Sequence, residues 1–160
     1  MTAERLDRSR PPPGYRTLFE HSKHYCEATV YEPAWRADVE AAAIDAAWAH
    51  HEAQNDPPGL TLRQGPHGLG FIALGKDSPV IGMFDWLEQA RSAAWQWYWR
   101  RVDCWRKSRD ALGRLQGRSD ANAIAAATWP GMLTWSDEQV DKHEAELLAE
   151  EKRLDGRRHA

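Results

Sequence analysis

The stretch Met83–Gln116, MFDWLEQARSAAWQWYWRRVDCWRKSRDALGRLQ, decides the fold. It contains no proline, and its one glycine, Gly113, comes close to its end. At about 100° per residue, its apolar side chains cover an arc of roughly 200° around a helix, which is wider than a surface helix needs. The arc consists of Phe84, Trp86, Leu87, Ala90, Ala93, Ala94, Trp95, Trp97, Tyr98, Val102, Cys104, Trp105 and Leu112. The sequence therefore predicts a long central helix over about 83–116, with neighbours on more than one side.

A second helix is predicted from Pro33 to about Ala53, where proline suits the first turn and alanine is frequent. Ile44 and Trp48 lie on one side of this helix. An alanine-rich stripe occupies the other side and comprises Trp35, Val39, Ala42, Ala46, Ala49 and Ala53. Because both sides are apolar, we expect this helix to pack on two neighbours.

The remaining elements are marked by turn and capping residues. Two short apolar segments within about 60–75 flank Gly65-Pro66-His67-Gly68, which predicts a β-hairpin. A short alanine-rich helix is predicted over 120–129, ended by Pro130 and Gly131. Ser136 followed by Gln139 forms a capping box, which predicts an acidic C-terminal helix over about 136–154.

These elements predict a mainly α fold, with four to five helices around the central helix and a small β-hairpin. Residues 1–14 are charged and end in three prolines and a glycine, so we expect a disordered or extended N-terminal arm. Residues 15–160 form a single helical domain in this interpretation, because about 150 residues are enough to bury one core. Nine tryptophans supply much of that core.

Composition limits the setting of the protein. The chain has only two cysteines, Cys26 and Cys104, whose separation fits no disulfide framework or redox pair. The first residues carry charges with no apolar stretch behind them, and no segment is long and apolar enough to cross a bilayer. The sequence therefore predicts a cytoplasmic protein without a membrane partner.

No catalytic motif survives a check of its context. Gly70–Asp77 approaches a phosphate-binding loop, but its interior is apolar, Asp77 stands where serine or threonine is needed, and Pro79 follows. His21, His24 and Cys26 are chemically suitable for zinc, although their spacing matches no strong zinc pattern. We therefore expect no enzyme activity, no cofactor and no metal, and the histidine–cysteine group remains the alternative.

Charge is segregated along the chain, although the net charge is only −3. Residues 91–118 hold eight basic and two acidic side chains, whereas residues 137–155 hold eight acidic and three basic ones. Arg91, Arg101 and Arg109 lie within or at the edge of the apolar arc, where long side chains usually pair or extend to solvent. One expectation is that the acidic helix lies against the basic helix and neutralises it, and the other is that both are free to bind partners.

Trp99 lies in the polar sector of the central helix, where a large side chain is either covered by another element or presented to a partner. The predicted partner-binding residues are Trp99, Arg100, Arg106, Lys107, Glu144, Glu146, Glu150 and Glu151. They suggest a non-enzymatic protein-binding module that occupies a macromolecular surface, steered by its charges. Its partner is expected to be a host protein or protein complex, and the acidic face can mimic nucleic acid. Small phage or mobile-element inhibitors of host machinery, including anti-CRISPR proteins, suit this size and composition.

Two alternatives use the same features differently. A nucleic-acid-binding protein would follow the phosphate backbone with Arg100, Arg106, Lys107 and Arg114 and stack bases on Trp99. A phage structural or assembly component would self-associate through the C-terminal helix, along Val140, Leu147 and Leu154 at heptad spacing.

Overall fold

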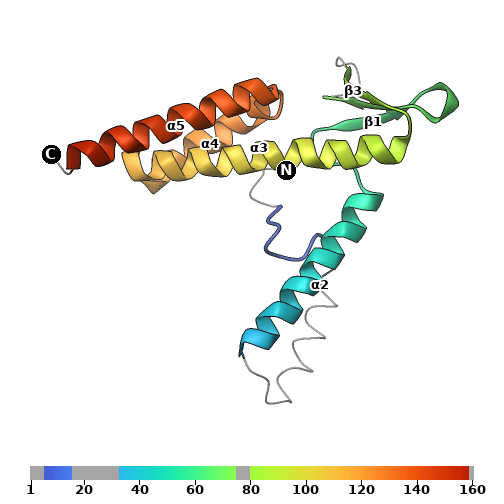
Figure 1. Cartoon of the computed structure of the whole chain (residues 1–160), viewed down its shortest axis with the longest axis horizontal. Helices are drawn as coiled ribbons and strands as arrows, with labels where there is room; N and C mark the ends of the chain where they lie inside the picture. The colour runs from blue at the N-terminus through green and yellow to red at the C-terminus, as the bar shows by residue number, and fades with distance from the viewer. Residues whose placement is uncertain (1–5, 16–32, 75–79, 159–160) are drawn as a thin grey trace.

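The computed structural model describes residues 6–15, 33–74 and 80–158. This part of the chain forms four α-helices and one small sheet, which confirms the mainly α prediction. Figure 1 shows the long helix α3 (Leu87–Gln116) running through the molecule, with the sheet beside one half and two helices beside the other. These two helices are α4 (Arg118–Met132) and α5 (Asp137–Arg158). The remaining helix, α2 (Pro33–Gln54), runs away from α3.

The sheet has three antiparallel strands in the order β1-β2-β3. The expected hairpin is formed by β1 (Thr61–Gln64) and β2 (Gly70–Ala73), in a register that pairs Leu62 with Ile72. The third strand, β3 (Val80–Phe84), was not predicted. Its residues include the first two of the predicted central helix, so the expected start at Met83 is wrong and α3 begins at Leu87. The error arose because Met83 and Phe84 suit both a helical arc and a strand.

The sheet packs closely against the first turn of α3 through Gly70. A Cβ atom at this position would lie 2.8 Å from the Leu87 Cα atom and 2.9 Å from the Trp86 carbonyl oxygen. On the same face, Ile72 is buried in the core and Leu62 packs against it. The close approach of the β2 backbone to α3 therefore requires glycine.

A chain of aromatic rings connects three helices through the core. Trp48 of α2 meets Trp95 of α3 edge to face at 6.5 Å, and Trp95 meets Tyr98 at 5.7 Å. Tyr98 in turn meets Trp129 of α4 at 5.8 Å, and Trp129 meets Trp105 at 6.2 Å. Edge-to-face pairs of this kind contribute about 0.5–1.5 kcal/mol each beyond the area that they bury. The aromatic side chains of α3 thus join helices that lie on different sides of it.

Buried indole N–H groups in this core have acceptors in the backbone. Trp48 donates to the Arg10 carbonyl at 2.6 Å, Trp95 to that of Asn55 at 2.8 Å and Trp105 to that of Ala125 at 2.7 Å. Each bond joins two elements distant in sequence. The tryptophans therefore contribute both apolar contact and directed hydrogen bonds.

The sequence predicts the span of α2 correctly, but only one of the two sides that were expected to pack is buried. Ala42, Ala46 and Ala49 of the expected alanine stripe are exposed, whereas Ala47 and Trp48 are buried. A tryptophan loses far more apolar surface to burial than an alanine does. The side of α2 that carries Trp48 therefore faces the core.

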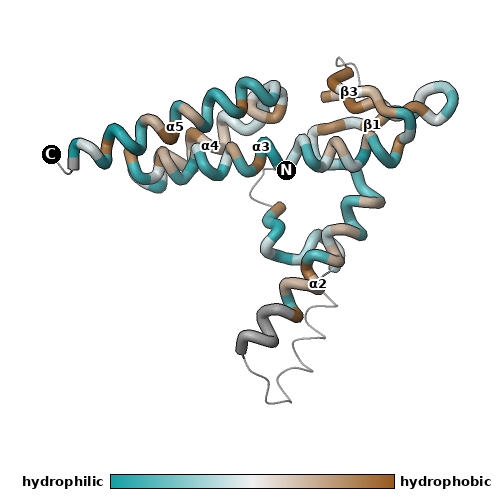
Figure 2. The backbone as a smooth tube through the Cα atoms, viewed as in Figure 1, coloured by the Kyte–Doolittle hydropathy of each residue, from teal (hydrophilic) through white to brown (hydrophobic). Residues whose placement is uncertain are grey.

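The end of α4 differs from the sequence prediction, whereas the start of α5 agrees with it. α4 continues past the predicted end at Trp129 through Pro130, since proline removes only one donor in the final turn. The predicted capping box is confirmed at α5, where the Gln139 N–H donates to Ser136 Oγ at 3.2 Å and the Ser136 N–H to Gln139 Oε1 at 2.8 Å. Figure 2 shows the mostly hydrophilic α5 beside α3.

The described part of the N-terminal arm, residues 6–15, contains turns but no helix or strand. Leu6 is buried in the core, and its carbonyl accepts a 3.0 Å hydrogen bond from Arg106. The Arg10 carbonyl accepts the Trp48 bond described above. This part of the arm thus lies against α2 and α3.

Candidate functional site

The basic side of α3 faces the acidic helix α5, which confirms the expectation that the two helices lie against each other. Arg100 donates to Glu144 at 2.5 Å and to Asp141 at 2.8 Å. Lys107 lies 2.9 Å from Asp103 of its own helix and 3.7 Å from Glu144. The hydrogen bond with Glu144 is the main cause of the raised pKa of Arg100. The network therefore neutralises the central part of the basic surface from within the chain.

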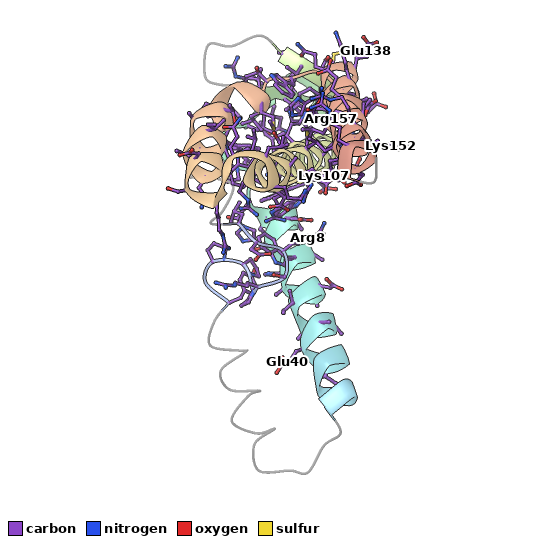
Figure 3. All side chains as sticks on the ribbon, turned by 90° about the vertical axis from the view of Figure 1, so that its left-hand side faces the viewer. Arg8, Glu40, Lys107, Glu138, Lys152 and Arg157 are labelled. Atoms are coloured by element: carbon purple, nitrogen blue, oxygen red, sulfur yellow. The ribbon has the colours of Figure 1, made fainter. Side chains whose placement is uncertain are left out.

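The network continues toward the C-terminus. Arg114 of α3 donates to Glu151 of α5, and Arg153 pairs with Glu150 within α5. Figure 3 places Lys107 on α3 and Lys152 on α5, which lies alongside it. Exposed pairs contribute little stability each, so their main effect is to leave fewer unpaired charges for a partner.

The predicted partner-binding residues are thus divided among several places. Arg100, Lys107 and Glu144 share one network, and Glu151 extends it. Arg106 instead binds the N-terminal segment, and Glu146 lies in a shallow groove with Trp135 and His143. The role of these residues as contacts to a partner remains a prediction.

Trp99, which lies on the polar sector of α3, is half covered by other elements. Its indole N–H donates to Glu52 Oε1 of α2 at 2.6 Å, and Trp48 of α2 meets its ring at 5.3 Å. The guanidinium of Arg8 lies 5.5 Å from the centre of the Trp99 ring. The expectation that another element covers this side chain is therefore confirmed for the N-terminal arm, and the other covering element is α2 rather than the C-terminal helix.

Arg101 confirms that an arginine within the apolar arc is paired. It is the only charged residue among those buried in the described part of the chain, at 1% exposure. Its guanidinium donates to the Trp135 carbonyl at 2.9 and 3.2 Å and to Asp137 at 2.6 Å. It also lies 3.3 Å from the centre of the Trp97 ring. Burial lowers the pKa of Arg101, and the hydrogen bond with Asp137 opposes that shift.

The line Val140, Leu147 and Leu154 on α5 was an expected self-association seam. Val140 is fully buried in the core, and the other two are half-buried. Leu147 lies in a groove with Lys107 and Arg114 of α3. The start of this line is therefore used for packing within the chain.

No group of three or more metal-ligating side chains occurs among the described residues. His21, His24 and Cys26 lie outside the described residues. No helix in the described part of the chain combines the length and the apolar character needed to cross a bilayer.

Cys104 is fully buried on α3, and burial raises the pKa of its thiol to about 11. In a Cys26→Ser variant, where Cys104 is the sole thiol, we expect a thiol reagent to react at pH 8 about 100-fold more slowly with the native protein than with the unfolded one. The reason is that the thiolate is the reactive form. Absorbance of the released reagent group, with and without denaturant, measures both rates. Native and unfolded rates within ten-fold of each other would contradict this prediction.

The largest exposed apolar side chains lie where β3 leads into α3. Met83 is 65% exposed and Trp86 is 59% exposed, and Val80 at the start of β3 is also exposed. We call Val80, Met83 and Trp86, which lie on β3 or directly follow it in the chain, the β3 patch. The sequence wrongly placed Trp86 within the buried arc, although it directly precedes α3 and has an extended backbone. The patch could have been found from the β-branched pair Val80-Ile81 after Pro79, which indicates a strand rather than a helix.

Val80 and Met83 belong to β3, which is an edge strand of the described sheet. In the described part of the chain, β3 has β2 as its single neighbour, so the backbone groups on its other side have no strand partner. On the next strand, Phe71 pairs with Met83 and is half-buried. An exposed edge with large apolar side chains is a typical place for another chain to bind.

Comparisons of the chain with models of known protein families, with curated proteins and with solved structures found no match.

Proposed function

We propose that this protein is a non-enzymatic protein-binding module that acts by occupying a surface of another macromolecule through the β3 patch. The observation that carries the proposal is the exposure of Met83 on β3, an edge strand of the described sheet, and of Trp86, which follows β3 in the chain. Tryptophan is enriched among residues that dominate binding energy, because it removes a large apolar surface from water on binding. Methionine adapts its shape to a partner surface.

The charges favour protein over nucleic acid as the partner. Arg100, Lys107 and Arg114, three of the four basic residues of the nucleic-acid alternative, pair with carboxylates of the same chain. Arg106 binds the N-terminal segment. A nucleic acid would have to compete with these contacts for each cation.

We further propose that the partner belongs to the machinery of a host cell and that the chain acts as an inhibitor of the kind carried by phages or mobile elements. Support for this narrower proposal comes from the size of the chain, from the paired charges of α3 and α5, and from the exposed apolar side chains of the β3 patch. The anti-CRISPR proteins are one class of such inhibitors. The site of action would be cytoplasmic.

Capture from lysate tests the proposal. The full chain is immobilised and exposed to host lysate treated with nuclease, and bound proteins are identified by mass spectrometry. We expect one protein or complex at near-stoichiometric amount, and we expect the Trp86→Ala variant to bind it at least about 30-fold more weakly, as for a dominant anchor. The matched control is Leu148→Ala, which removes another exposed apolar side chain on α5. Equal capture by Trp86→Ala and the wild type would show that the β3 patch is not the binding surface. Capture of nucleic acid alone would overturn the proposed protein-binding function.

A further inference from the structure

A cleft of about 930 Å³ lies between the end of α2 and the first half of α3, and none of the residues of the β3 patch lines it. Trp95 and Trp99 form part of its lining. Their rings stack at 6.0 Å with an angle of 24°, and the two indole N–H groups already donate to the Asn55 carbonyl and to Glu52. Trp95 is buried at 2% exposure, so the aromatic part of the cleft offers the π surface of Trp99 rather than hydrogen-bond donors.

A cation of the chain itself already lies in this cleft. The Arg8 guanidinium is positioned over the Trp99 ring, and its NH2 group is 3.6 Å from Glu52 Oε1. The Arg8 side chain is 51% exposed, whereas that of Glu52 is 18% exposed. Figure 3 shows Arg8 beside the part of α2 nearest to α3. The cleft thus binds a guanidinium through the face of the Trp99 ring and the Glu52 carboxylate. Arg8 itself is only partly enclosed, because half of its side chain remains exposed.

The other two arginines that line the cleft, Arg91 and Arg100, are already paired with carboxylates of the chain. Arg91 pairs with Asp56 at 3.4 Å and donates to the Ala53 carbonyl at 3.2 Å. Arg100 binds the carboxylates of α5. Glu88 also lines the cleft and forms no ion pair with any described residue. The charges left to meet a ligand, Glu52 and Glu88, are therefore negative.

We propose that this cleft binds an arginine side chain from a basic segment of another protein, and that Arg8 occupies the same place in the free chain. A guanidinium is favoured over an ammonium because it is planar, stacks on an indole and can bond a carboxylate through two N–H groups. Binding then exchanges one arginine for another, so that the N-terminal segment competes with the partner. This inference goes beyond the proposed function, because it uses residues outside the β3 patch.

Calorimetric titration of the full chain with short blocked peptides tests this site directly. The probes are a glycine peptide with two arginines, the same peptide with two lysines and the same peptide with two citrullines, which keep the shape but lose the charge. We expect the arginine peptide to bind most tightly and the citrulline peptide not to bind measurably. Equal binding of the citrulline and arginine peptides would overturn the proposal.

Three variants locate the binding. Removing the internal competitor in Arg8→Ala is expected to tighten binding of the arginine peptide by roughly 3- to 5-fold, the worth of one exposed cation–π contact and ion pair. Arg153→Ala on α5 is the control with the same change in net charge, and it should leave the affinity unchanged. Glu52→Gln is expected to weaken binding about 5-fold or more, since its amide oxygen still accepts the Trp99 bond but carries no charge. The Trp99 indole N–H resonance reports whether that bond persists.

An Arg8→Ala variant that binds the arginine peptide no more tightly than the wild type, or not at all, would overturn the competition. A Glu52→Gln variant that retains full affinity with its Trp99 resonance in place would overturn the site. Neither result depends on Trp86, so failure here is distinguishable from failure of the proposed function.

Discussion

An Arg101→Ala variant is expected to lose about 2–4 kcal/mol of its free energy of unfolding, the cost of a carbonyl left without its donors and of the cavity that the side chain leaves. Asp137 adds little to this loss, because its side chain is 75% exposed and its charge stays solvated. Arg101 joins α3 to the turn between α4 and α5, because its guanidinium donates twice to the Trp135 carbonyl and once to Asp137. The truncation leaves the carbonyl without these donors and opens a space beside Trp97. Urea unfolding followed by far-ultraviolet circular dichroism measures the loss.

Two further variants separate the causes of this effect. Arg101→Lys keeps the charge but cannot reproduce the planar contact with Trp97 or both bonds to Trp135, so we expect an intermediate loss. Arg153→Ala removes an exposed arginine that pairs within α5 and should change the free energy of unfolding by less than about 0.5 kcal/mol. A loss below 1 kcal/mol for Arg101→Ala would mean that α5 is held to α3 mainly by its other contacts.

A Gly70→Ala variant is the second change with a large expected effect on stability. The added methyl group would lie 2.7 Å from the Ala90 Cβ atom as well as too close to the backbone of Trp86 and Leu87. These neighbours are backbone atoms or a side chain that cannot rotate away, so the sheet has to move off α3. We expect a loss of roughly 1–3 kcal/mol or more, the range for overpacking a close-packed interior. Thermal unfolding by calorimetry measures it.

Gly113→Ala is the matched control for this substitution. Gly113 lies within α3, and its nearest neighbour for a new methyl group is the Ala121 Cβ atom at 3.9 Å, an ordinary contact. Since alanine favours helix more than glycine does, this variant should gain up to about 1 kcal/mol. If Gly70→Ala and Gly113→Ala had the same effect, the close approach of β2 to α3 would not be needed for stability.

Sequence reasoning succeeds where local chemistry decides the structure. The Ser136–Gln139 capping box begins α5 because its two bonds form within one turn of chain. The hairpin follows from turn residues between two apolar segments, and α3 follows from its long helical pattern. Sequence reasoning fails at Met83 and Phe84, because their side chains suit both a helix and a strand, and only pairing with β2 decides between the two. The same error hid the exposed Trp86.

Only part of each candidate site could be predicted from the sequence. Periodicity singled out Trp99, but the cleft around it needs Glu52 of α2 and Arg8 of the N-terminal segment, which are far from it in the sequence. Segregated charges indicated two possible arrangements of the helices. The contacts of Arg100 with Asp141 and Glu144 decide between them.

The sequence by itself determined the mainly helical class, the hairpin, the cap of α5 and the central position of α3, because each of these depends on propensity and periodicity within a short segment. Only the tertiary structure decided which side of α2 is buried, that β3 joins the sheet, that the basic and acidic helices neutralise each other, and that Trp86 is exposed. Those outcomes depend on contacts between segments distant in sequence, whose free energies no local pattern contains.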